Sequence, residues 1–494
     1  MRPLVLLVTC VLTGTYPRAA RAADTFPPPT IVRREDVAAR AIDSLLAAPE
    51  MVPTHVGIAV RSLDYHQWLV LHDADKLFVP ASNTKLLVAA AALYVLGPQA
   101  RFSTAVMTDA AVIDSILAGD VYLVARGAPD LVTGQLVTLA GRLRALGVRR
   151  IDGALVLDAT YFDSTAFGPG WMWDEGPVSY NAPVNAFMLN DNTVTITARP
   201  GPAPDAPVRV EVTPADAGIP VVVTAVTRGR TTDGPPLVVE RPRDAFVVRG
   251  TLPIGAQPIA VDRSVPDPAG YAGAVFAGAL RRMGVTLVGP VRAGAAPASA
   301  RTLAEVPSAL ADFLVRRFLK ESHNLTGEAL VKQLGVATNR GGTWRGGLAA
   351  IRAALADLAN VDPAAYYLAD GSGLSRYTEV SPRTFVEVIA AAADRFSMSP
   401  EFLAALSIGG TDGTLVHRLG EGDMAGQVRA KTGTMHGVSC LSGIVVTRAG
   451  ERLAFSILMN GFTGSAAALW YTQEEIVAAL RGIPPPWAVP AGSP

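Results

Sequence analysis

The sequence has little lysine, cysteine or histidine. Its 494 residues include five lysines: Lys76, Lys85, Lys320, Lys332 and Lys431. Any motif built on lysine is therefore informative. The two cysteines, Cys10 and Cys440, exclude a disulfide framework unless they pair with each other. None of the six histidines has a HExxH or Cys-His spacing, so the sequence supports neither a metal site nor a cofactor.

The sequence also has no excess of charge of either sign. Basic and acidic residues number 43 each, and no basic stretch stands out, which argues against a nucleic-acid partner. Beyond the N-terminus no apolar run reaches 18 residues, so we expect no transmembrane anchor in the mature chain. Half of the residues are apolar, which is enough for a sizeable core and excludes a disordered chain.

Residues 1–22 have the pattern of a signal peptide. Arg2 precedes a mostly apolar stretch at 4–13, and Ala20-Arg21-Ala22 is a small-x-small cleavage site. Cleavage there predicts export to the periplasm with Ala23 as the first mature residue. It would also remove Cys10, so we expect Cys440 to be unpaired, buried and inert.

Composition changes along the chain and predicts an inserted region. The stretch 101–295 contains no lysine and is rich in valine, proline and glycine. Two proline clusters within it, at 200–207 and 235–242, flank short valine-rich runs typical of strands. The predicted organisation is as follows: signal peptide 1–22; catalytic domain 23–100 and 296–483; inserted mixed domain 101–190 and 250–295; small β domain 191–249; flexible tail 484–494.

Ser82-Asn83-Thr84-Lys85 stands at the predicted start of an alanine-rich helix. Residues three apart share one helix face, so the amine can reach the hydroxyl. A neutral lysine can then take the serine proton, which requires a pKa lowered by burial or by a neighbouring cation. The motif is weak by itself, because Ser-x-x-Lys also occurs by chance.

Two further motifs follow in the chain. Ser322-His323-Asn324 lies between two predicted helices, where it could project side chains into a cleft or serve only as a helix cap. Lys431-Thr432-Gly433-Thr434 lies on a predicted strand. There the lysine could hold a carboxylate, and the glycine would let two backbones approach closely. Alone, an exposed strand lysine would be the better interpretation.

The order of the three motifs is informative, because Ser-x-x-Lys, Ser-x-Asn and Lys-Thr-Gly form the set of the penicillin-recognising serine acyl-transferases. With the long gap between Ser82 and Ser322, the sequence resembles the D-alanyl-D-alanine carboxypeptidase/endopeptidase family of class C low-molecular-mass penicillin-binding proteins, the peptidase S13 type. The resemblance extends to 168–171 and 370–375 and covers nearly the whole mature chain.

The resemblance implies an α/β (α+β) fold: a serine transpeptidase/β-lactamase-like domain, with an antiparallel sheet flanked by helices, that carries two inserted domains, the smaller mostly β. It also implies a substrate, peptidoglycan stem peptides ending in D-Ala-D-Ala, and covalent inhibition by β-lactams. The residues to which it assigns catalysis are Ser82, Lys85 and Ser322, and those to which it assigns substrate binding are Asn324, Lys431, Thr432 and Thr434.

In these implied roles, Ser82 Oγ attacks the carbonyl of the penultimate D-alanine and Lys85 is the base. Backbone N–H groups of Ser82 and Thr434 form the oxyanion hole. Ser322 relays a proton to the leaving amine, and Asn324 binds the substrate amide. Lys431 and Thr432 hold the terminal carboxylate. The family also places apolar residues near Leu374 and Met435 around the substrate side chain.

Other interpretations stay open. A β-lactamase-related hydrolase is disfavoured by the length of the insertion, and a non-catalytic cell-wall-binding protein of the same fold by the three intact motifs. No Gly-x-Ser-x-Gly occurs, which argues against an α/β-hydrolase. His436 could approach the substrate, although a surface position is favoured. Asp158 and Asp163 could face the cleft, although solvated loops are favoured.

Overall fold

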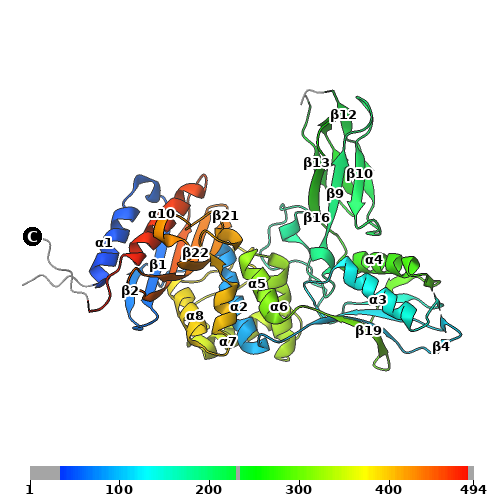
Figure 1. The fold of residues 1–494 in the computed structure, drawn as a ribbon, viewed down its shortest axis with the longest axis horizontal. Helices are drawn as coiled ribbons and strands as arrows, with labels where there is room; N and C mark the ends of the chain where they lie inside the picture. Colours follow the sequence, from blue (N-terminus) through cyan, green and yellow to red (C-terminus); the bar gives the residue numbers. More distant parts are fainter. Residues whose placement is uncertain (1–33, 230–233, 488–494) are drawn as a thin grey trace, which may run out of the picture.

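The structure is a computed structural model that describes residues 34–229 and 234–487. The predicted signal peptide, with Cys10, and the end of the predicted tail lie outside the described residues. Three regions follow one another in space (Figure 1). A layered domain carries the largest sheet, a mixed insertion lies beside it, and a β unit projects away from both.

The layered domain is built on a six-stranded sheet in which every neighbouring pair is antiparallel. The strands, in their order across the sheet, are β2 (Trp68–His72), β1 (His55–Ser62), β23 (Arg452–Asn460), β22 (Val438–Val446), β21 (Val428–Met435) and β20 (Ser407–Ile408). The two ends of the chain thus pair side by side, since β1 lies against β23.

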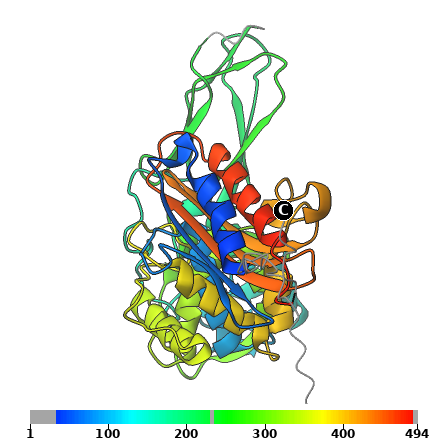
Figure 2. The ribbon, with the colours of Figure 1, turned by 90° about the vertical axis from the view of Figure 1, so that its left-hand side faces the viewer.

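Helices cover both faces of this sheet (Figure 2). The two that pack together on one face are α1 (Arg34–Leu46) and α10 (Ala467–Arg481). The helices on the other side are α2 (Thr84–Leu96), α5 (Ala311–Lys320), α6 (Asn324–Ala337), α7 (Trp344–Ala359), α8 (Pro382–Asp394) and α9 (Ser399–Ala405). Of these, α8 packs directly on β1 and β23, and α2 runs through the centre of the helical layer.

The alternation of side chains along β1 explains the two cores. Ile58 and Val60 join the apolar cluster that contains Ile42 of α1 and Ile476 of α10. Ala59, between them, joins the cluster of α2 and α8 on the opposite face. Successive side chains of a strand point to opposite faces, so a strand buried on both faces is apolar throughout.

The mixed insertion contains two sheets and two helices. The five-stranded sheet runs in the order β18 (Val291–Ala293), β8 (Leu155–Asp158), β6 (Val121–Ala125), β3 (Ser103–Thr108) and β19 (Arg301–Pro307). The four-stranded sheet runs in the order β17 (Thr286–Leu287), β7 (Arg150–Ile151), β5 (Ile116–Leu117) and β4 (Val112–Ile113). The helices α3 (Thr133–Ala145) and α4 (Pro268–Arg282) pack against each other.

The β unit consists of three small sheets. Its strands are β9 (Thr193–Arg199), β10 (Arg209–Thr213), β11 (Val221–Val223), β12 (Val226–Arg228), β13 (Val238–Glu240), β14 (Phe246–Arg249), β15 (Thr251–Pro253) and β16 (Ile259–Ser264). The sheets are β10-β9-β16, β11-β14-β13 and β12-β15. The valine-rich run 221–226, which lies between the two proline clusters, divides between two of these sheets.

Two expected boundaries fall too early. The catalytic domain was expected to resume at 296, but β19 pairs antiparallel with β3 and therefore belongs to the insertion as far as Pro307. The β domain was expected to end at 249, but β16 pairs with β9 as far as Ser264. In both cases the last strand of a sheet pairs with a strand that lies much earlier in the chain. Amino-acid composition carries no information about such long-range pairing.

Candidate active site

Ser82 stands on a short 3₁₀ turn, η2 (Ala81–Asn83), directly before α2. Helix α2 itself begins at Thr84, two residues later than the sequence predicted. Ala81 has a φ of 47°, a left-handed backbone that non-glycine residues rarely adopt and that often marks functional sites. The turn still brings Ser82 and Lys85 together, because Lys85 Nζ lies 2.8 Å from Ser82 Oγ.

Lys85 is completely buried and has three partners. Its Nζ atom donates to Asn324 Oδ1 at 2.8 Å and to the Ser372 carbonyl oxygen at 2.6 Å, besides its contact with Ser82. Burial lowers the pKa of Lys85 to about 7, against the opposing pull of Asp370 and Glu328. A large fraction of the amine is therefore neutral near pH 7, as a base requires.

Two buried carboxylates hold the loop that supplies the Ser372 carbonyl. Glu328 accepts from the backbone N–H groups of Gly371 and Ser372 and from Trp344 Nε1. Asp370 accepts from five donors: Trp171 Nε1, Ser372 Oγ, Gly373 N, Ser375 N and Thr378 Oγ1. Burial and the nearby charge of Asp370 raise the pKa of Glu328 to about 7.

Two glycines permit close backbone approach around Ser82. A Cβ on Gly433 would lie 2.6 Å from the Pro80 carbonyl oxygen, so the Lys-Thr-Gly strand packs directly on the serine turn. A Cβ on Gly373 would lie 1.9 Å from the Ala81 carbonyl oxygen. The close approach predicted for the glycine of Lys-Thr-Gly is confirmed. In the 370–375 loop, Gly373 permits a similar close approach to the serine turn.

Asn324 begins α6, with His323 as its N-cap. The Asn324 amide donates to the Tyr180 carbonyl oxygen at 2.9 Å while its oxygen accepts from Lys85. Asp191 of the insertion lies 3.3 Å from His323 Nε2 and accepts two hydrogen bonds from Arg317. Burial opposes its ionisation, but His323 and Arg317 hold the pKa of Asp191 at about 2.

Ser322 precedes this helix with a φ of 57°. It lines a cavity of about 260 Å³ beside Asp191, which shares Tyr180 and Asn324 with the cavity of Ser82, and its hydroxyl has no hydrogen-bond partner within residues 34–229 and 234–487. The expected position between two helices, α5 and α6, is confirmed. The contact with Lys85 is made by Asn324 instead.

Lys431 lies on β21 and is completely buried. Burial and repulsion from Lys85 lower the pKa of Lys431 well below its usual range. Lys431 Nζ donates to the carbonyl oxygen of Thr432 at 2.8 Å. Thr432 Oγ1 donates to Thr414 Oγ1 at 2.8 Å, a contact that the sequence did not suggest.

Ser82 opens into a cavity of about 410 Å³. Of the predicted residues, the lining includes Ser82, Asn324, Thr434, Leu374, Met435 and His436. Asp174, Glu175 and Tyr180 reach it from the insertion. Arg376 reaches it from the position directly after the 370–375 loop, so both charge signs meet at its wall. Arg376 donates to the carbonyl oxygen of His436 at 2.8 Å, which fixes one side. His436 lines the cavity although its side chain is exposed.

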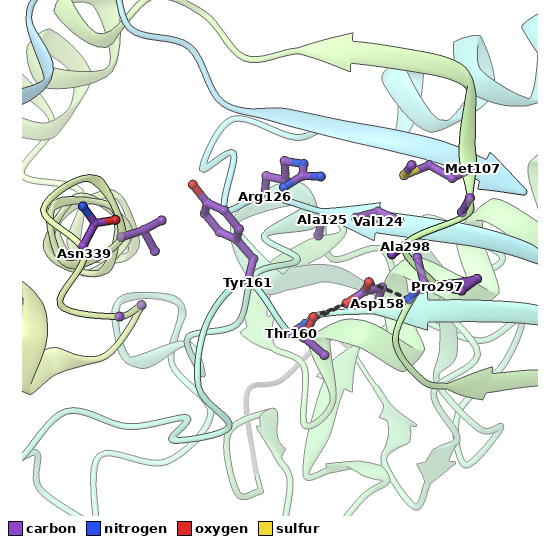
Figure 3. A pocket seen from close by; sticks show the side chains of 15 residues that line it. Met107, Val124, Ala125, Arg126, Asp158, Thr160, Tyr161, Pro297, Ala298 and Asn339 are labelled. Atoms are coloured by element: carbon purple, nitrogen blue, oxygen red, sulfur yellow. Dashed lines mark hydrogen bonds between the residues drawn. The ribbon is translucent and has the colours of Figure 1, made fainter.

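A larger cavity, of about 750 Å³, lies away from Ser82 between the insertion and the end of α6 (Figure 3). Its carboxylate, Asp158, already accepts from Thr160 N, Thr160 Oγ1 and Ala296 N, and therefore holds its own loop together. Asp163 accepts from the buried Lys332 at 2.5 Å. Neither acid faces the cavity of Ser82, and Asp158 is buried where a solvated loop was expected.

The remaining predictions concern metals and thiols. Within the described part of the chain, no group of three or more His, Cys, Asp or Glu side chains is placed to hold a metal ion. Cys440 is free and buried as predicted, and burial raises the pKa of its thiol to about 12. Among the described helices, none is both long and apolar enough to cross a bilayer.

The sequence did not identify every residue that shapes the site. Glu328, Trp171 and Tyr180 are missing from the predicted set, although each bonds a residue beside Ser82 or Lys85. The run 370–375, to which the resemblance extends, is the loop whose Ser372 carbonyl contacts Lys85. The sequence offered one signal for Glu328: it is a glutamate in a mostly apolar predicted helix, four residues after Asn324 of the Ser-x-Asn motif.

A six-stranded antiparallel sheet packed between helices, with a serine and a lysine in contact at the head of the central helix, defines the class of β-lactamase-like serine hydrolases. Residues 38–481 match the model of the D-Ala-D-Ala carboxypeptidase 3 (S13) family. The chain belongs to this family of peptidases, and it is an enzyme of the D-Ala-D-Ala carboxypeptidase class.

Individual relatives agree with this assignment. The chain is 37% identical over 440 residues to a D-alanyl-D-alanine carboxypeptidase of Actinomadura sp. (strain R39), covering 86% of this chain and 81% of the relative. Penicillin-binding protein 4 (dacB) of Haemophilus influenzae has a similar structure, with a TM-score of 0.80 at 26% identity, covering 89% of this chain and 99% of that one. The same protein complexed with a β-lactam gives a TM-score of 0.77.

Proposed function

We propose that the chain cleaves the terminal D-alanine from peptidoglycan stem peptides through an acyl-enzyme on Ser82. The contact between Ser82 Oγ and Lys85 Nζ carries this proposal, because the pKa of Lys85 is lowered to about 7. A neutral amine has two N–H donors and one lone pair. Asn324 and Ser372 accept the two donors, so the lone pair is directed at the Ser82 hydroxyl.

The steps follow from this geometry. Ser82 attacks the carbonyl of the penultimate residue while its proton passes to Lys85. The oxyanion is stabilised by the backbone N–H groups of Ser82 and Thr434, two residues that line the same cavity. The leaving D-alanine takes a proton through Ser322, and Asn324 binds the substrate amide. Lys431 and Thr432 hold its terminal carboxylate. Water then hydrolyses the ester, which restores Ser82.

The same site also suits hydrolysis of the D-alanyl bond that cross-links two stem peptides. The cavity wall carries both charge signs and can therefore bind a polar peptide side chain. We also propose that the protein is exported to the periplasm after cleavage behind Ala22. Sequencing of the mature N-terminus tests this, with Ala23 expected. An intact Met1 or a lipid on Cys10 would contradict it.

Product analysis on purified muropeptides, monomeric and cross-linked, tests the activity. Release of D-alanine from pentapeptide monomers is expected, together with cleavage of dimers. The control is Ser82→Ala, which should abolish both reactions. Absence of product from the unmodified enzyme, with an intact fold, would favour a non-catalytic wall-binding protein.

A further inference from the structure

Three consecutive residues of the insertion, Asn190, Asp191 and Asn192, have a left-handed backbone, with φ values of 48°, 59° and 54°. Asparagine and aspartate adopt this conformation more readily than other non-glycine residues, but normally one residue at a time. Such a strained stretch persists only where the surrounding structure holds it, and it is common at functional sites. This turn lies at the catalytic domain, since Asp191 and Ser322 line the same cavity.

The two asparagines anchor the turn within the insertion. Asn190 Oδ1 accepts from Thr133 N at 3.0 Å, and its Nδ2 donates to the Tyr271 hydroxyl at 2.8 Å. Asn192 is completely buried and donates to two backbone carbonyl oxygens of the insertion, at 2.9 and 3.1 Å. Asp191, between them, makes its side-chain contacts with the catalytic domain.

Asp191 closes a ring of polar contacts around Ser322. Its carboxylate accepts from both terminal nitrogens of Arg317 in α5, at 3.1 and 2.7 Å. Arg317 Nε also donates to Glu321 at 3.2 Å, and His323 Nε2 lies 3.3 Å from Asp191. Glu321 and His323 are the chain neighbours of Ser322, so one network holds the backbone on both sides of this serine.

His323 uses both of its ring nitrogens in this arrangement. Its Nδ1 accepts from Thr326 N at 3.3 Å, as the N-cap of α6. The proton of the neutral ring is therefore on Nε2, which faces Asp191. The contact with Asp191 thus orients the middle residue of the Ser-x-Asn motif.

Ser322 depends on this support more than Asn324 does. Asn324 is held by its own side chain, which donates to the Tyr180 carbonyl oxygen and accepts from Lys85. Ser322 has a φ of 57°, and within residues 34–229 and 234–487 no hydrogen bond holds its hydroxyl. The position of that hydroxyl is therefore set by the backbone, which the network of Asp191 holds.

We propose that Asp191 is a positioning residue: through Arg317 and His323 it holds Ser322 where the serine hydroxyl can give a proton to the leaving amine. The proposal rests on the proposed function for the role of Ser322. A displacement of about 1 Å in a reacting group can cost roughly 10²-fold in rate. Loss of the Asp191 contacts should therefore slow the step that needs Ser322 and leave the contact between Ser82 and Lys85 intact.

The test compares two substrates with one acyl group and different leaving groups. The peptide acyl-D-Ala-D-Ala releases an amine, which must be protonated as it leaves. The thioester acyl-D-Ala-thioglycolate keeps the terminal carboxylate but releases a thiolate, which leaves without a proton. Because both form the same acyl-enzyme on Ser82, Ser322→Ala should lower kcat/KM for the peptide far more than for the thioester.

Asp191→Asn is the informative variant, because asparagine keeps the shape of the side chain and tolerates the left-handed backbone while it removes the charge. It should lower kcat/KM for the peptide by about 10- to 100-fold and barely change that for the thioester. The matched control is Asp216→Asn, which removes an aspartate of the insertion that pairs with Arg281 and Arg282, and it should change neither substrate.

A double variant checks that Asp191 acts through the serine. Adding Asp191→Asn to Ser322→Ala should cause no further loss on the peptide, because the residue to be positioned is already gone. A further loss of the size seen in the single variant would show that Asp191 acts elsewhere and would overturn the proposal.

Equal losses on peptide and thioester in Asp191→Asn, or no loss, would also overturn the proposal. So would a Ser322→Ala variant that treats the two substrates alike, since Asp191 would then have no proton donor to position. If the unmodified enzyme turns over the thioester but releases no D-alanine from the peptide, the proposed function fails, and the role of Asp191 fails with it.

Discussion

Asn324 and Lys85 are joined by a hydrogen bond of 2.8 Å between Oδ1 and Nζ, and this bond links the start of α6 to the start of α2. The same amide donates to the Tyr180 carbonyl oxygen of the insertion. Through these two hydrogen bonds, Asn324 orients the Lys85 amine and connects it to the insertion. After Lys85 takes the serine proton, the ammonium can donate to Ser82, Asn324 and Ser372 together, so the arrangement suits both protonation states.

Lys85→Arg should lower acylation by penicillin by about 10²- to 10⁴-fold, because a guanidinium stays protonated and cannot act as a base. Acylation of the unmodified enzyme should rise with pH with an apparent pKa of about 7, since the neutral form of Lys85 is the active one. The rate with labelled penicillin, followed from pH 5 to 9, measures both.

Lys76→Arg is the control for Lys85→Arg, since Lys76 is exposed and forms an ion pair with Asp73. Circular dichroism would show whether the buried arginine disturbs the fold. If penicillin acylates a folded Lys85→Arg variant at a near-normal rate, Lys85 is not the base.

Lys431→Ala should lower turnover of acyl-D-Ala-D-Ala by about 10- to 150-fold. The bound terminal carboxylate favours the ammonium form of Lys431, and the resulting charge-assisted hydrogen bond is worth about 1.5–3 kcal/mol. For a peptide with an amidated C-terminus, which has no terminal carboxylate, the variant should turn over the substrate almost as fast as the unmodified enzyme does. Steady-state kinetics on the two peptides measure the difference. Equal losses on both would show that Lys431 acts through Lys85, whose charge it repels.

Penicillin should form a long-lived adduct on the tryptic peptide 77–85, in which Ser82 is the only serine. The leaving group of the opened β-lactam ring stays tethered at the site, where it keeps out the water that hydrolyses the peptide ester. A β-lactamase adds a further base for this step, whereas the carboxylates buried behind the site, Glu328 and Asp370, are both occupied by protein donors. Mass spectra of the intact protein and of its peptides after brief exposure would show the adduct.

Many rapid turnovers of penicillin would instead establish a β-lactamase. An adduct on Ser322 would require a different mechanism altogether.

Trp171→Phe should destabilise the fold by about 1.5–3 kcal/mol, because it keeps most of the ring but removes the hydrogen bond to the buried Asp370 carboxylate. Trp173→Phe, at an exposed position two residues away, should change stability by less than about 0.5 kcal/mol. Thermal unfolding of the two variants compares them. Similar melting temperatures would mean that the other four donors of Asp370 suffice.

The sequence determined the chemistry of this protein and the local elements around it. The order of Ser82-x-x-Lys85, Ser322-x-Asn324 and Lys431-Thr432-Gly433 predicted the family, because spacing within each motif is a local property. Helix α8 was not predicted, although Ser381 followed by Pro382 is a typical start: the serine accepts from Thr384 N as a cap.

Only the tertiary structure decided which residue contacts which. Asn324 rather than Ser322 reaches Lys85, and Glu328 and Asp370 fix the loop beneath it, through bonds between residues far apart in the chain. The low pKa of Lys85 is likewise a tertiary property, because burial is its main cause and burial depends on the packing of α2 inside the helical layer. Strands β16 and β19 close sheets over long sequence distances, a pairing that composition cannot reveal.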